Sequence, residues 1–192
     1  MNPPHPVRGT FWFLWLCSVA FVQGGCAHAS SSAGLTPTVP APRVSPSPSA
    51  PAPCQTQHLR LAFDKSAAAL SNDGAQFILV NQSQQGCTLF GYPALQLLDA
   101  GHQAIRAQVV PSTGAYLYIR HAPHRFVLQA RRKAYFVVEW GNLGDCAPPP
   151  ALLRVTPPGH QTPLLLAFRF CPYKDGVEIS PLEPDQVLGA FV

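Results

Sequence analysis

The chain has 192 residues, of which 22 are proline and 14 are glycine, and only 11% of its residues are charged. This composition is typical of strands joined by turns and does not fit helices laced with pairs of Glu and Lys. When Arg8 and Arg43 are set aside, eleven basic residues stand against nine acidic ones. That balance is too weak to indicate a nucleic-acid-binding protein.

Residues 1–25 have the organisation of a signal peptide. Arg8 is the only charged residue before an apolar run of twelve residues, Phe11 to Val22. A helix of twelve residues rises about 18 Å, which is too short to cross a hydrocarbon core of about 30 Å. We therefore expect the run to be the apolar part of a secretion signal and the protein to be exported.

The sequence leaves two ways of processing this leader open. Gly-Gly-Cys at residues 24–26 resembles the end of a lipoprotein signal, in which Cys26 receives the lipid, although Gln23 stands where leucine is usual. Ala-His-Ala at residues 27–29 is equally a site for ordinary signal peptidase. Cys17 would leave with the leader and the four later cysteines can pair, so Cys26 would otherwise be an odd cysteine. This favours a lipid anchor at Cys26, with a plain secreted protein as the alternative.

Residues 26–53 should form a disordered tether. The segment from Ser30 to Pro53 consists mainly of Ser, Ala, Pro and Thr, and Arg43 is its only charged residue. It cannot bury enough apolar surface to offset the entropy lost on ordering. In a polyproline-like conformation these 24 residues would reach about 75 Å. Such a tether suits a domain held away from a membrane anchor.

Residues 54–192 should form one folded domain of the immunoglobulin-like β-sandwich class. Ten short runs with strand character are spaced about ten residues apart, as in a sandwich. They cover residues 57–63, 76–81, 88–90, 94–98, 104–110, 126–129, 134–140, 152–156, 164–170 and 177–179. In the seventh run the even-numbered residues should face the core, leaving Tyr135, Val137 and Glu139 outside. The ninth run is apolar on both faces and predicts a central strand, and residues 66–71 are the one partial helix candidate.

The four cysteines of the domain flank two predicted connections. Cys54 and Cys87 stand on either side of residues 64–75, and Cys146 and Cys171 on either side of the turn at Pro-Pro-Gly 157–159. If each connection joins antiparallel strands, both cysteines of a pair arrive at the open end of one hairpin. We therefore predict the disulfides Cys54–Cys87 and Cys146–Cys171, formed in an oxidising compartment.

The middle of the domain carries a family resemblance. Gly74 and Leu-Val-Asn at 79–81 precede Cys-Thr-Leu-Phe-Gly-Tyr-Pro at 87–93, and an apolar run and Asp-Ala-Gly at 99–101 follow. This pattern resembles the bacterial envelope family catalogued as domain of unknown function 4232, and the similarity extends to Cys171. The resemblance implies a secreted protein or lipoprotein with a β-sandwich fold and no established activity. The loop 111–125, rich in Tyr, His and Arg, departs from the family pattern.

No cluster in the sequence indicates a catalytic chemistry. His121 and His124 stand three residues apart, but no carboxylate or cysteine stands near them in the sequence to complete a metal site. A Gly-x-Ser-x-Gly motif is missing, and the acidic residues are scattered singly. We therefore expect no enzymatic activity, no metal, no cofactor and no nucleic-acid partner. A small extracytoplasmic hydrolase with a loop-built site and a metal-delivery protein remain the alternatives.

The strongest surface signal is a set of cations around the sixth predicted strand. If residues 126–129 form a strand, these cations lie at its two ends: Arg120, Arg125, Arg131, Arg132 and Lys133. Such a patch suits lipid headgroups, an anionic envelope polymer or an acidic protein partner. The alternative is charge that only keeps the domain soluble. The sequence thus predicts a non-catalytic binding or structural module of the cell envelope, attached to the membrane by lipid, with an unidentified ligand.

Overall fold

The computed structural model describes residues 50–118, 120–144, 149–172 and 176–189. The predicted leader, Cys26, most of the tether and Cys146 lie outside these residues. No helix in the described ranges is long and apolar enough to cross a bilayer. The elements are η1 (Thr56–His58), β1 (Leu59–Ala69), β2 (Asn72–Asn81), β3 (Cys87–Phe90), β4 (Ala94–Leu98), β5 (Val109–Pro111), β6 (Arg125–Leu128), β7 (Lys133–Gly141), β8 (Leu152–Thr156), β9 (Leu164–Ala167) and β10 (Val177–Ile179).

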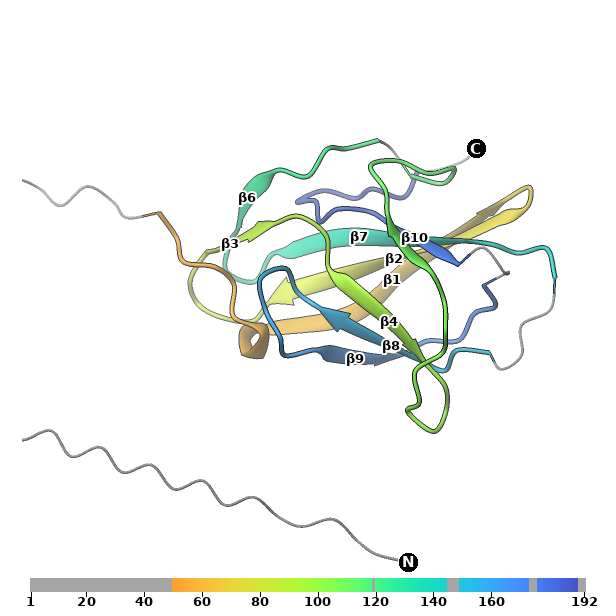
Figure 1. Cartoon of the computed structure of the whole chain (residues 1–192). Coiled ribbons are helices and arrows are strands. Elements are labelled where there is room, and N and C mark those ends of the chain that lie inside the picture. The colour runs from red at the N-terminus through yellow and green to blue at the C-terminus, as the bar shows by residue number, and fades with distance from the viewer. Residues whose placement is uncertain (1–49, 119, 145–148, 173–175, 190–192) are drawn as a thin grey trace, which may run out of the picture. The chain divides into compact units, whose positions relative to one another are not determined.

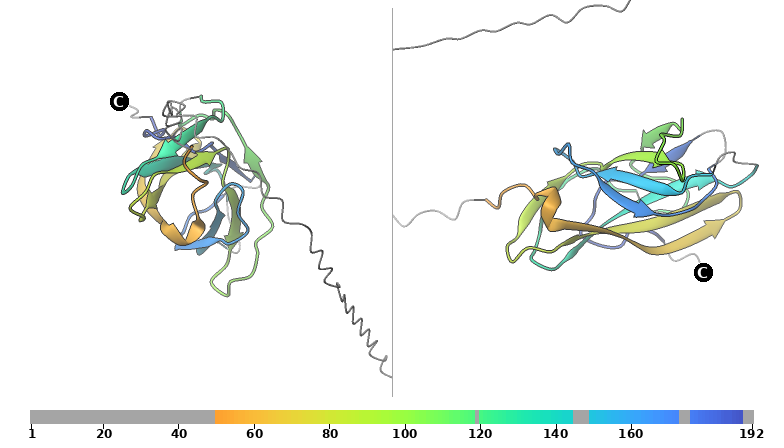
Figure 2. Two further views of the ribbon diagram at one scale, coloured as in Figure 1. Left: turned by 90° about the vertical axis from the view of Figure 1, so that its left-hand side faces the viewer. Right: turned by 90° about the horizontal axis from the view of Figure 1, so that it is seen from below.

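The strands form sheets that pack on a shared core, as the sequence predicts for a β-sandwich (Figure 1). The largest sheet has the order β1-β2-β7-β10-β5, and its β10–β5 pair is parallel. A three-stranded sheet, β4-β8-β9, and a two-stranded sheet, β3-β6, lie across the core from it. Seen from one end, the strands surround the core on all sides (Figure 2). The all-β sandwich is therefore confirmed.

The core-facing residues of β2 and β7 alternate as expected for strands with one face inward. Phe77 of β2 stacks on Phe136 of β7 with 5.4 Å between ring centroids, and Phe168 meets Phe77 edge-on at 5.0 Å. Leu97 of β4 and Leu153 of β8 complete the centre of the core and are almost fully buried. Burying aromatic and branched side chains from several sheets supplies most of the stabilisation of such a fold.

The other face of the large sheet is also covered, which corrects the sequence prediction for β7. Val137 is fully buried and Glu139 is only 5% exposed. The reason is a second apolar cluster, in which Leu117 and Val187 lie on this face together with Leu188. Because chain segments at residues 112–118 and 180–189 cross the sheet there, both faces of β2 and β7 are covered.

The hairpin of β1 and β2 extends through the segment predicted to connect them. The two strands pair from Leu59 opposite Asn81 to Ala69 opposite Asn72, so Leu70 and Ser71 form the turn. The partial helix considered over residues 66–71 is therefore wrong, because these residues continue β1 up to Ala69. The close approach of Leu117 explains the glycine of the family pattern: a Cβ on Gly74 would lie 2.9 Å from Leu117 Cδ1.

Strand β9 lies at an edge, although its apolar sequence predicts a central strand. It pairs only with β8 in the sheet order, and its exposure alternates along the strand. Leu165 points outward and is 52% exposed. The apolar run therefore reflects one face packed on the core and one left at the surface.

The predicted disulfide Cys54–Cys87 is confirmed. The two cysteines are bonded, with their Cα atoms 4.7 Å apart and a separation of 33 positions in sequence. They stand at the open end of the β1–β2 hairpin, as the sequence argument requires. Cys171 is also disulfide-bonded. Its predicted partner, Cys146, lies outside the described residues, so that pairing stays a prediction.

Candidate functional site

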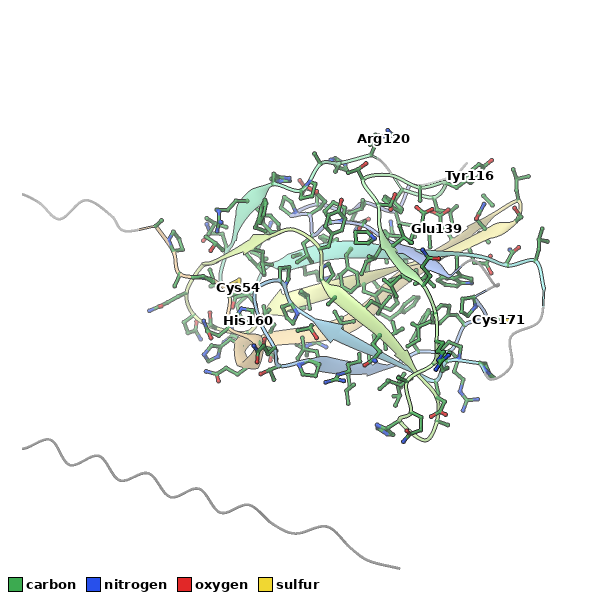
Figure 3. The ribbon with its side chains drawn as sticks, in the orientation of Figure 1. Cys54, Tyr116, Arg120, Glu139, His160 and Cys171 are labelled. Atoms are coloured by element: carbon green, nitrogen blue, oxygen red, sulfur yellow. A yellow bond between two sulfur atoms is a disulfide. The ribbon has the colours of Figure 1, made fainter. Side chains whose placement is uncertain are left out.

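The five predicted cations lie in three places around β6. Arg125 begins β6, and its guanidinium stands 5.5 Å from the centre of the exposed Phe90 ring. Arg120 is separate from the others, in the loop before β6, where its backbone passes close to Gly114 (Figure 3). Arg131, Arg132 and Lys133 follow one another after β6 and stay together. We call these last three residues the basic corner.

The basic corner borders a hollow at the start of β7. The hollow has a volume of about 460 Å³ and is lined by the three cations together with Tyr135, Pro184, Asp185 and Gln186. All three cations are exposed, and none of them forms an ion pair with another described residue. Lys65 of β1 donates a 2.8 Å hydrogen bond from Nζ to Oε1 of Gln186, one of the residues that line the hollow. Asp185 is the single acid among residues that line this hollow.

Asn81, the last residue of β2, holds the backbone under the basic corner. Its buried side-chain amide donates to the carbonyls of Gln85, Leu128 and Gln129, at 2.8, 3.1 and 3.3 Å. Its backbone exchanges hydrogen bonds of 3.0 Å with the turn: Arg131 N–H donates to the Asn81 carbonyl, and Asn81 N–H donates to the Arg132 carbonyl. This buried residue therefore joins the turn before β7 to the loop before β3.

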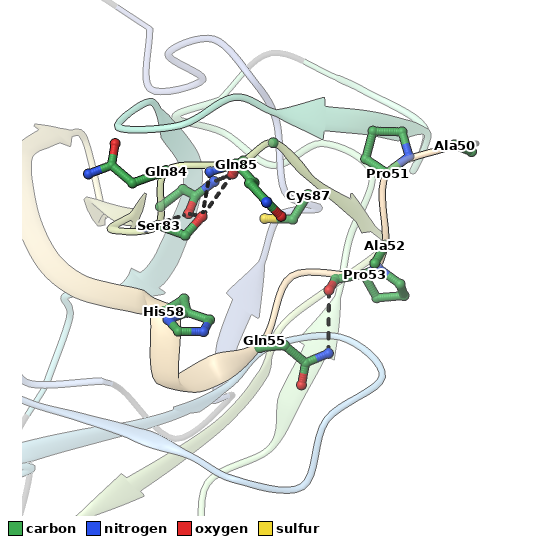
Figure 4. A pocket seen from close by; sticks show the side chains of 12 residues that line it. Ala50, Pro51, Ala52, Pro53, Gln55, His58, Ser83, Gln84, Gln85 and Cys87 are labelled. Carbon is green, nitrogen blue, oxygen red and sulfur yellow. Dashed lines mark hydrogen bonds between the residues drawn. The ribbon is translucent and has the colours of Figure 1, made fainter. Parts of the chain in front are cut away.

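A second hollow of about 700 Å³ lies where the chain enters the domain (Figure 4). Ala50 to Pro53 form one wall, and His58 and the loop Ser83–Cys87 form the other. Gln55, Gln84 and Gln85 are among the residues that line it. Since the sulfur of Cys87 is held in a disulfide, the hollow has no free thiol among these residues.

The structure brings a carboxylate to the two loop histidines, which the sequence did not show. Glu183 Oε2 lies 3.6 Å from Nδ1 of His124, and Glu183 is buried while the His124 side chain is 49% exposed. Glu183 Oε1 is also buried and has no hydrogen-bond partner. Burial raises the pKa of Glu183, an effect that His124 and His121 partly oppose. The sequence alone could not indicate this contact, because Glu183 stands about sixty residues further along the chain than these histidines.

This environment predicts a pH dependence that one substitution should remove. A carboxyl whose pKa is raised in the folded state binds its proton more tightly there, so stability falls as pH rises above the unfolded value of about 4.3. We expect Glu183→Gln to unfold at higher urea concentration than the wild type at pH 7, with the difference shrinking as pH falls toward 4.3. Urea titrations across this range measure the difference.

Asp185→Asn provides the matched control for this prediction. The negative charge of Asp185 contributes to the raised pKa of Glu183. Removing that charge should therefore lower the pKa of Glu183 and shift the loss of stability to lower pH without abolishing it. A pH profile of Glu183→Gln identical to that of the wild type would contradict the assignment.

Two further polar side chains on the covered face of the large sheet hold the segments that cross it. Glu139 accepts hydrogen bonds from Tyr116 N–H at 3.0 Å and Leu117 N–H at 2.7 Å (Figure 3). Burial raises the pKa of Glu139, against the effect of these two bonds. Gln76 Oε1 accepts from Val187 N–H and Leu188 N–H, both at 2.9 Å. Glu139 and Gln76 therefore both accept hydrogen bonds from backbone N–H groups of the segments that cross the sheet.

The described residues contain no group of three or more His, Cys, Asp or Glu side chains placed to hold a metal ion. What the surface offers instead is the basic corner, where three cations converge on one hollow. A model of the family described as Domain of unknown function (DUF4232) matches residues 54–181. No curated protein and no solved structure matches the chain.

Proposed function

Because this chain belongs to the DUF4232 family, whose match covers 54–181 of its 192 residues, we propose that it is a lipid-anchored, non-catalytic binding module of the cell envelope. The disulfide Cys54–Cys87 supports an extracytoplasmic location, because such bonds persist in oxidising compartments. The apolar leader ending in Gly-Gly-Cys at 24–26 supports the lipid anchor.

The main support for a binding role is that three buried polar side chains are used within the fold, whereas the exposed cations of the basic corner are not. Gln76, Asn81 and Glu139 are buried, and each binds backbone groups of this chain. The basic corner is exposed and forms no ion pair within the described residues. Exposed cations gathered on one hollow favour an anionic ligand. A hydrolase or a metal-delivery protein would instead need reactive groups converging on one point, and the nearest such group is the pair His124 and Glu183.

The anchor is tested by replacing the cysteine that would carry the lipid. Cys26→Ser should move the protein from the membrane fraction to the soluble fraction and abolish its labelling by a fatty-acid probe. Cys17→Ser is the matched control, because this cysteine lies within the predicted leader and its loss should leave labelling unchanged. A membrane fraction unchanged by Cys26→Ser would rule out the anchor, and a mature N-terminus at Ser30 would establish the secreted alternative.

A further inference from the structure

We propose that the basic corner docks the domain onto an anionic phospholipid surface, with the end at which the chain enters the domain turned toward that surface. The proposal rests on the proposed role as an anchored envelope module and names the ligand of that role. It requires that the cations be exposed, held in place, and located on the anchored side.

The cations are available for binding. Arg131 and Arg132 lie in the turn after β6, and Lys133 is the first residue of β7. All three are exposed and line one hollow of about 460 Å³. A hollow bordered by three cations and one acid attracts phosphate groups, and lipid headgroups present these at a surface.

The turn that carries two of these cations is held in a fixed conformation. Arg132 N–H donates to the Gln129 carbonyl at 3.1 Å, which closes the turn, and Asn81 binds both Arg131 and Arg132 through its backbone. Arg131 has a φ of +64°, in the left-handed region that Asn and Gly adopt with less strain. Backbone preference therefore does not explain an arginine here, which favours a role for its side chain. A rigid turn also loses little entropy on binding.

The anchored side of the domain is the side of the basic corner. The entering segment runs beside β3, where Pro53 bridges Thr88 and Cys54 is bonded to Cys87. Cys87 in turn lies opposite Leu128, the last residue of β6, from which the chain passes into the corner. Figures 1 and 2 show the entering segment and the turn between β6 and β7 at the same end.

Three of the four acidic residues in the strands of the large sheet lie toward its other end, and the fourth, Asp64, lies near the middle of β1. Strand β7 runs from Lys133 at the corner to Gly141, a span of about 26 Å at 3.3 Å per residue. Near its far end, Glu139 lies opposite Glu178, and Trp140 lies opposite Asp73. Asp185 is the acid at the corner itself, and there it stands against three cations. The positive charge of the corner would therefore face an anionic membrane while Asp73, Glu139 and Glu178 lie further from it, which favours a flat anionic surface as the ligand.

The expected interaction is weak and depends on salt. Each cation close to an anionic bilayer contributes about a five-fold gain in partitioning, so three together contribute on the order of a hundred-fold. Salt at physiological strength screens such attraction beyond about 8 Å. A weak contact is sufficient for a chain that is already anchored, because the tether holds the domain at high local concentration near the bilayer.

The test uses the full chain with Cys26→Ser, so that binding through lipid is removed. We expect this chain to sediment with phosphatidylglycerol vesicles at low salt, and to remain in solution with phosphatidylcholine vesicles or at high salt. Adding Arg131→Asn, Arg132→Gln and Lys133→Gln should weaken sedimentation on the order of a hundred-fold. The Asn at 131 suits the left-handed backbone, and an unchanged urea midpoint would show that the fold is intact.

A second triple variant separates the corner from net charge. Arg106, Arg154 and Arg169 are exposed cations outside the corner, and their replacement by Gln removes the same charge. We expect this variant to bind within about two-fold of the parent, since charges far from the surface are screened. The proposal would be overturned if both triple variants lost vesicle binding equally or if both kept it equally. It would also be overturned if the chain bound soluble polyphosphate as tightly as vesicles. Because every arm lacks the thiol at residue 26, a negative result here leaves the anchor test unaffected.

Discussion

Replacing both Cys54 and Cys87 by alanine should lower the free energy of unfolding by about 3 to 4 kcal/mol. The bond joins residues 33 positions apart and so restricts the conformations of the unfolded chain. Without the bond the unfolded chain has more conformational entropy, which stabilises it relative to the folded state. The bond also fixes the entering segment beside β3, where Thr88 N–H donates to the Ala52 carbonyl at 2.9 Å. Urea unfolding monitored by tryptophan fluorescence measures the change.

The double alanine variant is the suitable comparison, because a reducing agent would also act on the disulfide of Cys171. The single variant Cys54→Ala should lose about the same stability as the double variant, since either change opens the same loop. A loss below about 1 kcal/mol would mean that the unfolded state stays compact around this segment without the bond.

Most strand positions and the first disulfide were predictable because each depends on local pattern, whereas the strand predicted over residues 104–110 forms only at its end, as β5. Strands β4, β8 and β10 begin and end at the residues that the sequence predicts. The pair Cys54–Cys87 was predicted because the two cysteines flank one connection between strands. The prediction is confirmed although β1 and β2 are longer than predicted. Because the strands are longer, the turn lies at Leu70 and Ser71. The open end of the hairpin, where Leu59 lies opposite Asn81, is still the end next to the two cysteines.

The covered outer face of the large sheet was not predictable from the pattern of β7. Val137 and Glu139 stand at the alternate positions of β7, whose side chains face away from the main core. The sequence of a strand does not indicate that a distant segment will cover that face. The segments that cover this face have little regular structure of their own, so they have no periodicity to detect. They are held by single side chains such as Glu139 and Gln76, whose partners stand far away in sequence.

The candidate site was predictable in part. Sequence placed five cations around β6, but it did not separate Arg120 and Arg125 from the basic corner or place Asp185 at its hollow. It also did not explain Asn81, the asparagine of the family pattern. The structure gives that residue a physical role, because its amide holds three carbonyls from two separate segments. Such a role depends on contacts between distant residues, which one sequence does not display.

Gln76→Leu should release the C-terminal segment from the large sheet while the main core stays folded. The substitution leaves the buried N–H groups of Val187 and Leu188 without an acceptor. It also removes the 2.7 Å hydrogen bond from Gln76 Nε2 to Asp64 Oδ2. Each buried group left unsatisfied costs about 1 to 3 kcal/mol, so the loss should amount to several kcal/mol unless the segment detaches. Hydrogen exchange should then show lost protection at residues 187 and 188, with protection kept at Phe136.

Gln76→Glu is the matched control, because it keeps an oxygen acceptor for both N–H groups and changes only the contact with Asp64. Two carboxylates would then face each other, and sharing a proton between them relieves their repulsion. We expect this variant to lose protection at residues 187 and 188 at neutral pH and to regain it on acidification, whereas Gln76→Leu should show no recovery. If the leucine variant kept full protection at both amides, the segment would be held by its apolar contacts, Val187 and Leu188 on Val137, and not by the buried amide of Gln76.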